Sequence, residues 1–381
     1  MQIFYMPTKI LMGEGVTGKI GSEAKMIGAT TVLVVTDEGI RKAGLLEKVI
    51  LSLEDAGIEV DIFAEVTPDP TVKLVEKGAA IVKRKGHDLI IAVGGGSSID
   101  AAKGVSVMAT NEGSICDFEG VDKFTHKPLP VFAVPTTVGT GSEVTFGAVL
   151  TNTTRNYKFL VYGDSIAPRV AFLDPVMVST APTSVIISTG MDALTHAIES
   201  YISLRATPQT EALAIGAIKL IGANLRQAVA NSENFAAVGN MLIAANLAGI
   251  AFGNSRLGIV HAMALPLGAF FHVPHGIANT VLLPYGLEFN LIATPQKYVD
   301  IASAMGETTG GMSLMDAAEK AIESVKKLGG DIGAPKNLKS LGVEADMISQ
   351  MAADAMKSSH IPANPRKISS KDVEELYRKA L

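Results

Sequence analysis

The spacing of hydrophobic positions changes near the middle of the chain and divides the sequence into two parts. In the first part, short runs rich in β-branched residues alternate with amphipathic stretches, which is the pattern of parallel strands joined by helices. Each run ends where glycine or polar residues begin. We predict strands at residues 31–36, 59–64, 88–93 and 130–134, and helices at 45–56, 71–85 and 98–110.

The second part is rich in Ala, Leu, Ile and Met with helical periodicity and carries no strand pattern. Residues 181–183 have the composition of a helix start. We therefore predict two domains, which also suits a chain of 381 residues. Residues 1–183 form an α/β domain with a Rossmann-like, doubly wound parallel sheet, whose ligands bind beyond the carboxyl ends of the strands. Residues 184–381 form an all-helical domain.

Composition narrows the class of function. The chain is 48% hydrophobic and 19% charged, which excludes a disordered protein. Its net charge is -5 and it has no basic tract, so we expect small-molecule chemistry and no nucleic-acid partner. Polar residues interrupt the apolar stretch 236–271, so we expect buried helices and no membrane partner.

Cysteine content and the first residues suggest a compartment. The chain has a single cysteine, Cys116, which cannot form an intrachain disulfide. Residues 1–10 lack the pattern of a signal peptide, so we expect a cytoplasmic protein. A high apolar content with few charges also favours self-association, as a homodimer or a larger homo-oligomer.

A glycine-rich turn follows the predicted strand 88–93. Gly94, Gly95 and Gly96 lack side chains, and a predicted helix follows them directly. Bare backbone at a helix N-terminus can hold a pyrophosphate. The spacing is not that of the G-x-G-x-x-G fingerprint, so a simple strand-to-helix turn is the alternative interpretation.

Two further features are compatible with a dinucleotide. Residues 135–145 (PTTVGTGSEVT) combine hydroxyls and glycines after a predicted strand, although a polar loop often has this composition. Asp37 follows the strand 31–36, where a carboxylate can bind an adenosine ribose and repel a 2′-phosphate. Asp37 would then favour NAD over NADP; alternatively, it is only the N-cap of the next helix.

Four side chains in the helical part have the chemistry of metal ligands. Asp192 and His196 are four residues apart on a predicted helix and therefore share one face. His261 and His275 lie in strongly apolar sequence. An isolated Asp–His pair is usually hydrogen bonded, and lone histidines are usually core residues. However, these three histidines, of only seven in the chain, lie with Asp192 in apolar sequence, and the set suits Fe²⁺ or Zn²⁺ without distinguishing them.

Five motifs together give the chain a family resemblance. They are GGGSSIDAAK at 94–103, PTTVGTGSEVT at 135–145, GMDALTHAIESY at 190–201, GIVHAMALPLG at 258–268 and PHGIAN at 274–279. The chain resembles the iron-containing (group III) alcohol dehydrogenases, which include lactaldehyde reductase and 1,3-propanediol dehydrogenase and are similar in fold to dehydroquinate synthase. The resemblance implies an NAD-dependent enzyme that interconverts small primary alcohols or diols and their aldehydes by hydride transfer.

The resemblance also implies site residues. It assigns the metal, usually Fe²⁺ and in some members Zn²⁺, to Asp192, His196, His261 and His275. Phe252 matches an aromatic of the substrate pocket. The residues that would line the dinucleotide are Asp37, Asp69, Gly95, Gly96, Ser97, Thr136, Thr137, Thr140 and Lys158.

The chain departs from the family pattern at two positions. Leu265 replaces a histidine that is not a ligand but lies near the nicotinamide, so the route of the proton is open. His272 is a candidate for that proton transfer, with a simple structural histidine as the alternative. Arg256 stands where a small residue is usual; it forms a surface ion pair or favours a substrate with a distal carboxylate, such as a hydroxy acid or semialdehyde.

Two other classes of function compete with this one. A lyase of the dehydroquinate-synthase type would need a basic pocket, and the chain has no cluster of Lys and Arg. Such enzymes also use a glutamate where this chain has Asp192. A non-catalytic nucleotide-binding protein is the third hypothesis, and only the departure at Leu265 supports it.

Overall fold

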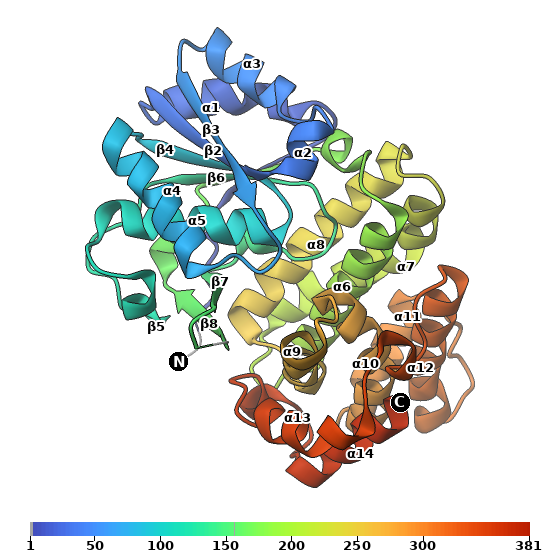
Figure 1. The fold of residues 1–381 in the computed structure, drawn as a ribbon. Coiled ribbons are helices and arrows are strands. Elements are labelled where there is room, and N and C mark those ends of the chain that lie inside the picture. The colour runs from blue at the N-terminus through green and yellow to red at the C-terminus, as the bar shows by residue number, and fades with distance from the viewer. Residues whose placement is uncertain (1–2, 156) are drawn as a thin grey trace. The chain divides into compact units, whose positions relative to one another are not determined.

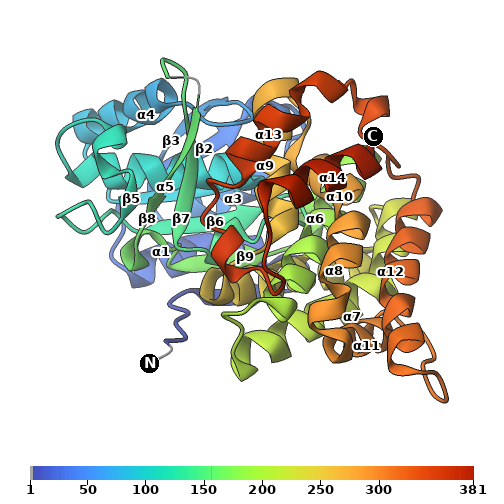
Figure 2. The same cartoon turned by 90° about the horizontal axis from the view of Figure 1, so that it is seen from below.

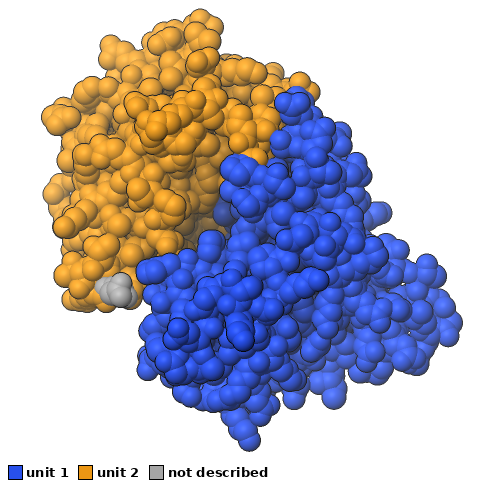
Figure 3. Space-filling view, turned by 45° about the vertical axis from the view of Figure 1, so that its right-hand side comes forward, with its two compact units in different colours: residues 1–5, 138–140, 182–381 blue, residues 6–137, 141–181 orange. Residues whose placement is uncertain are grey.

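The chain forms two compact units, as seen in a computed structural model that describes residues 3–155 and 157–381 (Figure 3). One unit, here the α/β unit, comprises residues 6–137 and 141–181. The other, here the helical unit, comprises residues 182–381 together with 3–5 and 138–140. The sequence pattern predicts one boundary at residue 183, and it carries no signal for the two short segments that join the helical unit.

A parallel sheet forms the centre of the α/β unit (Figure 1). Within the described residues it has six strands in the order β1-β9-β6-β4-β2-β3, and every neighbouring pair is parallel. The four predicted strands are confirmed, whereas the edge strand β1 and its neighbour β9, only four residues each, are not predicted. The bounds are β1 Lys9–Met12, β2 Thr31–Asp37, β3 Glu59–Val66, β4 Leu89–Gly94, β6 Val131–Pro135 and β9 Val170–Leu173.

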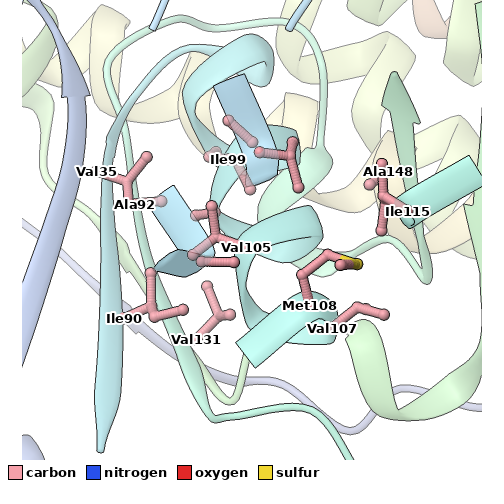
Figure 4. Close-up of a cluster of buried hydrophobic side chains, with 14 of the residues drawn as sticks. Val35, Ile90, Ala92, Ile99, Val105, Val107, Met108, Ile115, Val131 and Ala148 are labelled. Carbon is pink, nitrogen blue, oxygen red and sulfur yellow. The ribbon is translucent and has the colours of Figure 1, made fainter. Parts of the chain in front are cut away.

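Helices cover the two faces of this sheet, which is why its central strands are almost continuously hydrophobic. Helices α1 and α3 pack on one face, and α4 and α5 pack on the other (Figure 1). On the second face, side chains of β2 and β4 such as Val35 and Ile90 meet Ile99 and Val105 of α5 (Figure 4). The helices are α1 Ile20–Met26, α2 Glu38–Lys42, α3 Glu47–Asp55, α4 Val72–Lys85 and α5 Gly96–Thr110.

The strand order reverses beside β2. The chain continues from β2 outward to β3 and then returns to place β4 on the other side of β2. Asp37 ends β2 and Gly94 ends β4, and a carbon atom added to Gly94 would stand 3.5 Å from Asp37 Oδ2. Doubly wound sheets bind their ligands at such a reversal, so this end of the sheet is the expected cofactor region.

A second, smaller sheet was not predicted from the sequence. It contains β5 (Gly120–Val121), β8 (Tyr157–Tyr162) and β7 (Gly147–Asn152) in that order, with β7 and β8 antiparallel. The ammonium group of Lys103, fully buried in α5, anchors it by donating to Ser142 Oγ (3.0 Å), Thr145 Oγ1 (3.1 Å) and the Gly147 carbonyl (2.8 Å). One lysine therefore ties this sheet and the preceding loop to the helix that follows the glycine-rich turn.

The helical unit is a bundle in which α7 and α8 pack on each other and on α6. Helices α7 and α8 are long and apolar enough to cross a membrane by length and composition, but they lie within this bundle. Helix α13 packs against α9 and α14 (Figure 2). The helices are α6 Thr183–Ile202, α7 Pro208–Ala230, α8 Phe235–Ser255, α9 Ile259–Phe271, α10 His275–Asn290, α11 Pro295–Ala304, α12 Leu314–Asp331, α13 Ile348–Ala355 and α14 Ser370–Ala380.

The buried lysine generates a stability prediction. Burial lowers the pKa of Lys103 from 10.5 to about 8, so between these values the unfolded chain binds a proton that the folded chain has released. The free energy of unfolding should therefore rise with pH in this window, by up to about 3 kcal/mol relative to a Lys103→Met variant. Urea unfolding at a series of pH values measures it.

The matched control is Lys73→Met, since Lys73 is exposed on α4. Its stability should follow the wild-type pH curve. Parallel pH curves for the wild type and Lys103→Met would contradict the assignment of the effect to Lys103.

Candidate functional site

Helix α6 places three polar side chains on one face. Asp192, His196 and Glu199 are separated by four and then three residues, which is the spacing of neighbours along a helix face. All three side chains are buried, and most of their neighbours on α6 are apolar. Buried groups of this kind require partners, because burial without a hydrogen bond or an opposite charge is costly.

Three possible ligand atoms converge beside Asp192. Its Oδ1 atom lies 3.7 Å from His261 Nε2 and 3.9 Å from His275 Nε2, and all three atoms lie within 4.8 Å of one another. An ion with ligands at about 2.1 Å in a tetrahedral site separates them by about 3.4 Å. Small shifts of these side chains would therefore suit one divalent cation. The side chain of His275 is 44% exposed, whereas Asp192 and His261 are buried.

The amide of Asn279 supports this assignment. Its Nδ2 atom lies 2.7 Å from Asp192 Oδ1 and 3.1 Å from each of the two Nε2 atoms. An amide has two N–H groups, so it cannot serve all three acceptors at once. The Asn279 Oδ1 atom is buried without a hydrogen-bond partner among the described residues. The three acceptors are therefore undersupplied with donors, which is the chemistry of a cation site.

His196 lies next to this group of three atoms but is not part of it. Its ring is stacked between Phe252 (4.4 Å between ring centroids) and His261 (4.6 Å). Its Nδ1 atom lies 3.3 Å from the Gly139 carbonyl and 4.0 Å from Asp192 Oδ2. The structure thus brings Phe252 and the predicted fourth ligand to the same centre, and the role of His196 as a ligand stays a prediction.

The protonation states of Asp192, His196 and His261 leave these side chains able to accept hydrogen bonds or to bind a cation. Burial lowers the pKa of His196 and lowers that of His261 well below its ordinary value, so both imidazoles are neutral at pH 7. Burial alone would raise the pKa of Asp192, but the charge that the neighbouring histidines carry when protonated, together with the hydrogen bond from the Asn279 amide, outweighs it and lowers that pKa. A carboxylate beside neutral imidazoles is the protonation state in which these groups bind a metal.

Three polar residues near this centre were missed in the sequence analysis. Glu199 Oε2 lies within hydrogen-bond distance of His261 Nδ1, at 2.6 Å. Its spacing from Asp192 on one helix face was a usable signal, and so was the spacing of Asn279 from His275. His360, after α13, lies with its ring centroid 6.2 Å from that of His261, and burial lowers its pKa to about 4. His360 is far in sequence from the predicted ligands, so no motif or spacing connected it with them.

The departures from the family pattern are placed as follows. His272 is the C-cap of α9, exposed and with a left-handed φ of 55°. Leu265 is 42% exposed on the same helix, four residues after His261. Arg256 ends α8 with a φ of 67°, a conformation that favours glycine. No contact joins His272 to the three ligand atoms among the interactions of the described residues, and its catalytic role stays a prediction.

The glycine-rich turn in the α/β unit has the features of an anion site. Gly95 is the N-cap of α5 and provides no side-chain cap, so the first amides of the helix have no partner from that residue. Opposite Gly95 lies Thr137, whose Oγ1 atom is buried without a partner among the described residues. Ser97 lies in the first turn of α5, and the Thr136 amide donates to the Gly94 carbonyl at the end of β4. Amide and hydroxyl donors therefore lie close together at this turn, beside a backbone without side chains.

The other residues predicted to bind the cofactor lie at several different positions in the fold. Asp37 is the N-cap of α2, because its Oδ1 accepts from the Ile40 amide at 3.0 Å, while its second oxygen lies near Gly94. Asp69 and Lys158 form an ion pair at 2.6 Å. Thr140 belongs to the segment 138–140 that joins the helical unit.

Comparison with known proteins confirms the resemblance. Residues 7–175 match the family described as iron-containing alcohol dehydrogenase, and residues 186–381 match its C-terminal region. The chain is 44% identical to the 1,3-propanediol dehydrogenase of Citrobacter freundii, covering 99% of this chain and 98% of that protein. It is 38% identical to the NAD-dependent methanol dehydrogenase of Bacillus methanolicus over the full length of both. A crystal structure of 1,3-propanediol oxidoreductase matches with a TM-score of 0.98 and 43% identity over all of both chains. The chain therefore belongs to the iron-containing alcohol dehydrogenase family.

Proposed function

We propose that this protein is an NAD(H)-dependent, metal-dependent dehydrogenase that interconverts small primary alcohols or diols and their aldehydes. The observation that carries the proposal is the convergence of Asp192 Oδ1, His261 Nε2 and His275 Nε2 in a member of this family. Relatives named for 1,3-propanediol and for NAD-dependent methanol oxidation support the substrate class and the cofactor. The donor set suits Fe²⁺, with Zn²⁺ as the alternative.

Asp192, His196, His261 and His275 would hold the metal, which acts as a Lewis acid on the substrate oxygen when bound. One carboxylate and neutral imidazoles would leave part of the positive charge of a divalent ion uncompensated, and this charge would make the substrate hydroxyl more acidic. Phe252, stacked on His196, provides an apolar surface beside these ligands. This surface would exclude water from the reacting carbon.

The α/β unit would hold the dinucleotide. The first amides of α5 and the Thr137 hydroxyl supply donors for a pyrophosphate, and Gly95 allows close approach of the backbone. Asp37 would bind the adenosine ribose and repel a 2′-phosphate. The remaining residues assigned to the cofactor are Asp69, Gly96, Ser97, Thr136, Thr140 and Lys158. We assign His272 to proton transfer, since it is the exposed imidazole nearest in sequence to His275.

Reduction of a panel of aldehydes tests the proposed function. Neutral aldehydes and acidic semialdehydes should be supplied with NADH, and the loss of NADH absorbance should match the aldehyde consumed. A chelator should abolish turnover and Fe²⁺ should restore it. Asp192→Asn should lower turnover by more than about 100-fold, because it removes the anionic ligand. The proposal would be contradicted if the metal-loaded protein oxidised no NADH with any aldehyde of the panel.

The choice between NAD and NADP is tested at Asp37. We expect Asp37→Ser to lower the preference for NADH over NADPH, measured as a ratio of kcat/KM values, by at least about tenfold, or about 1.4 kcal/mol. The serine removes the charge that would repel a 2′-phosphate but can still cap α2, so stability should hardly change. An unchanged ratio in this variant would show that Asp37 only caps the helix.

A further inference from the structure

Glu199 lies behind His261, on the side of the imidazole away from the ligand atoms. The glutamate is only 3% exposed, and its Oε2 atom lies 2.6 Å from His261 Nδ1. A histidine that donates from Nδ1 keeps its lone pair on Nε2. That second nitrogen is the atom that faces Asp192 Oδ1 at 3.7 Å. The contact with Glu199 therefore selects the tautomer that can bind a cation.

The same carboxyl group also caps the helix that carries His261. It accepts from the Val260 amide at 2.7 Å and from the His261 amide at 3.3 Å, in the first turn of α9. The N-cap of α9 is Gly258, which has no side chain to cap with. A carbon atom added there would stand 3.0 Å from Glu199 Oε1, so a side chain would displace the glutamate.

In both of its backbone hydrogen bonds to α9, Glu199 accepts from an amide nitrogen, at Val260 and at His261. A carboxylate can only accept hydrogen bonds, so an anionic Glu199 requires the proton of His261 to be on Nδ1, which lies 2.6 Å from Oε2. The partial positive charge of a helix N-terminus adds to the stabilisation of a buried carboxylate. The geometry thus suits an anionic Glu199 that holds both the ring and the backbone of His261.

We propose that Glu199 is a positioning residue of the metal centre, which fixes the tautomer and the orientation of His261. It does so from α6, the helix that also provides Asp192 and His196, so one helix holds two predicted ligands directly and a third through its partner. Such carboxylate–histidine pairs orient metal ligands and make them better donors. This inference rests on the metal site of the proposed function.

A purely structural role is the competing explanation, and Asn364 offers a matched control for it. Asn364 Oδ1 accepts from the Ile259 amide at 3.1 Å, so it caps the same turn of α9. It also exchanges hydrogen bonds with Asn290 at 2.8 and 2.9 Å. None of its hydrogen bonds reaches the ring of His261. A loss of capping alone should therefore appear equally in variants of Asn364 and Glu199.

The experiment compares metal affinity in the wild type, Glu199→Gln and Asn364→Ala, each full length. Fe²⁺ and Zn²⁺ are each titrated against a chromophoric chelator, and circular dichroism verifies folding. Glutamine has the size of glutamate, but it has one acceptor oxygen and no charge. We expect Glu199→Gln to bind metal about 10- to 100-fold more weakly than the wild type. Asn364→Ala should be less stable but should bind metal within about threefold of the wild type.

The outcomes separate the two proposals. A wild-type chain that binds neither metal would overturn the proposed metal site itself. Metal binding by the wild type with equal affinity in folded Glu199→Gln would overturn the positioning role alone. Equal losses of affinity in both variants would assign the effect to helix capping and also overturn it.

A second measurement uses only the wild type, in case Glu199→Gln does not fold. Nitrogen NMR of histidine-labelled, metal-free protein reports which ring nitrogen carries the proton. We expect His261 to be neutral with its proton on Nδ1, identified by loss of its signals in His261→Gln. A proton on Nε2 would overturn the inference, because that nitrogen could not then face a cation.

Discussion

The helical unit depends on one constraint, which is that charged and imidazole groups buried among apolar helices need partners. Asn279 donates to Asp192, the Gly139 carbonyl faces His196, and Glu199 lies within hydrogen-bond distance of the His261 ring. Glu199 and Gly139 contact Nδ1 atoms, whereas the Asp192 and Nε2 acceptors share one amide that has too few N–H groups for them. The resulting excess of acceptors is a property of the folded chain, and a divalent cation would satisfy all of them together.

In the α/β unit the polar groups without partners are hydrogen-bond donors, whereas in the helical unit they are acceptors. At the start of α5 the chain leaves donors without side-chain caps, and the Thr137 hydroxyl lies beside them without a partner among the described residues. Deeper in the same helix, Lys103 has three oxygen partners and is therefore not available to a ligand. One unit thus offers donors suited to an anion and the other offers acceptors suited to a cation, as the proposed function requires.

The parts of this arrangement that could be predicted from the sequence are those set by local periodicity. The central strands and their helices were found because burial on both faces makes strands such as β4 continuously apolar. Asp192 and His196 were paired because helix spacing places them on one face. The small sheet was missed because β5 has only two residues and because β7 (GAVLTN) and β8 (YKFLVY) carry no regular alternation of apolar and polar residues. His360 and the contact between Lys103 and Ser142 could not be found, because they depend on tertiary packing between distant segments.

The motifs also contain residues whose role is to be small. A carbon atom added to Gly276 would stand 2.5 Å from the Ser188 carbonyl oxygen, and one added to Gly139 would collide with the backbone of Thr189. Both contacts are made with α6, just before Asp192. A side chain at Gly276 would push α10 and His275 away from α6, and one at Gly139 would move the carbonyl that faces His196. Since displacements near 1 Å can disable a catalytic site, a side chain at either glycine should impair the site, although neither glycine provides a ligand.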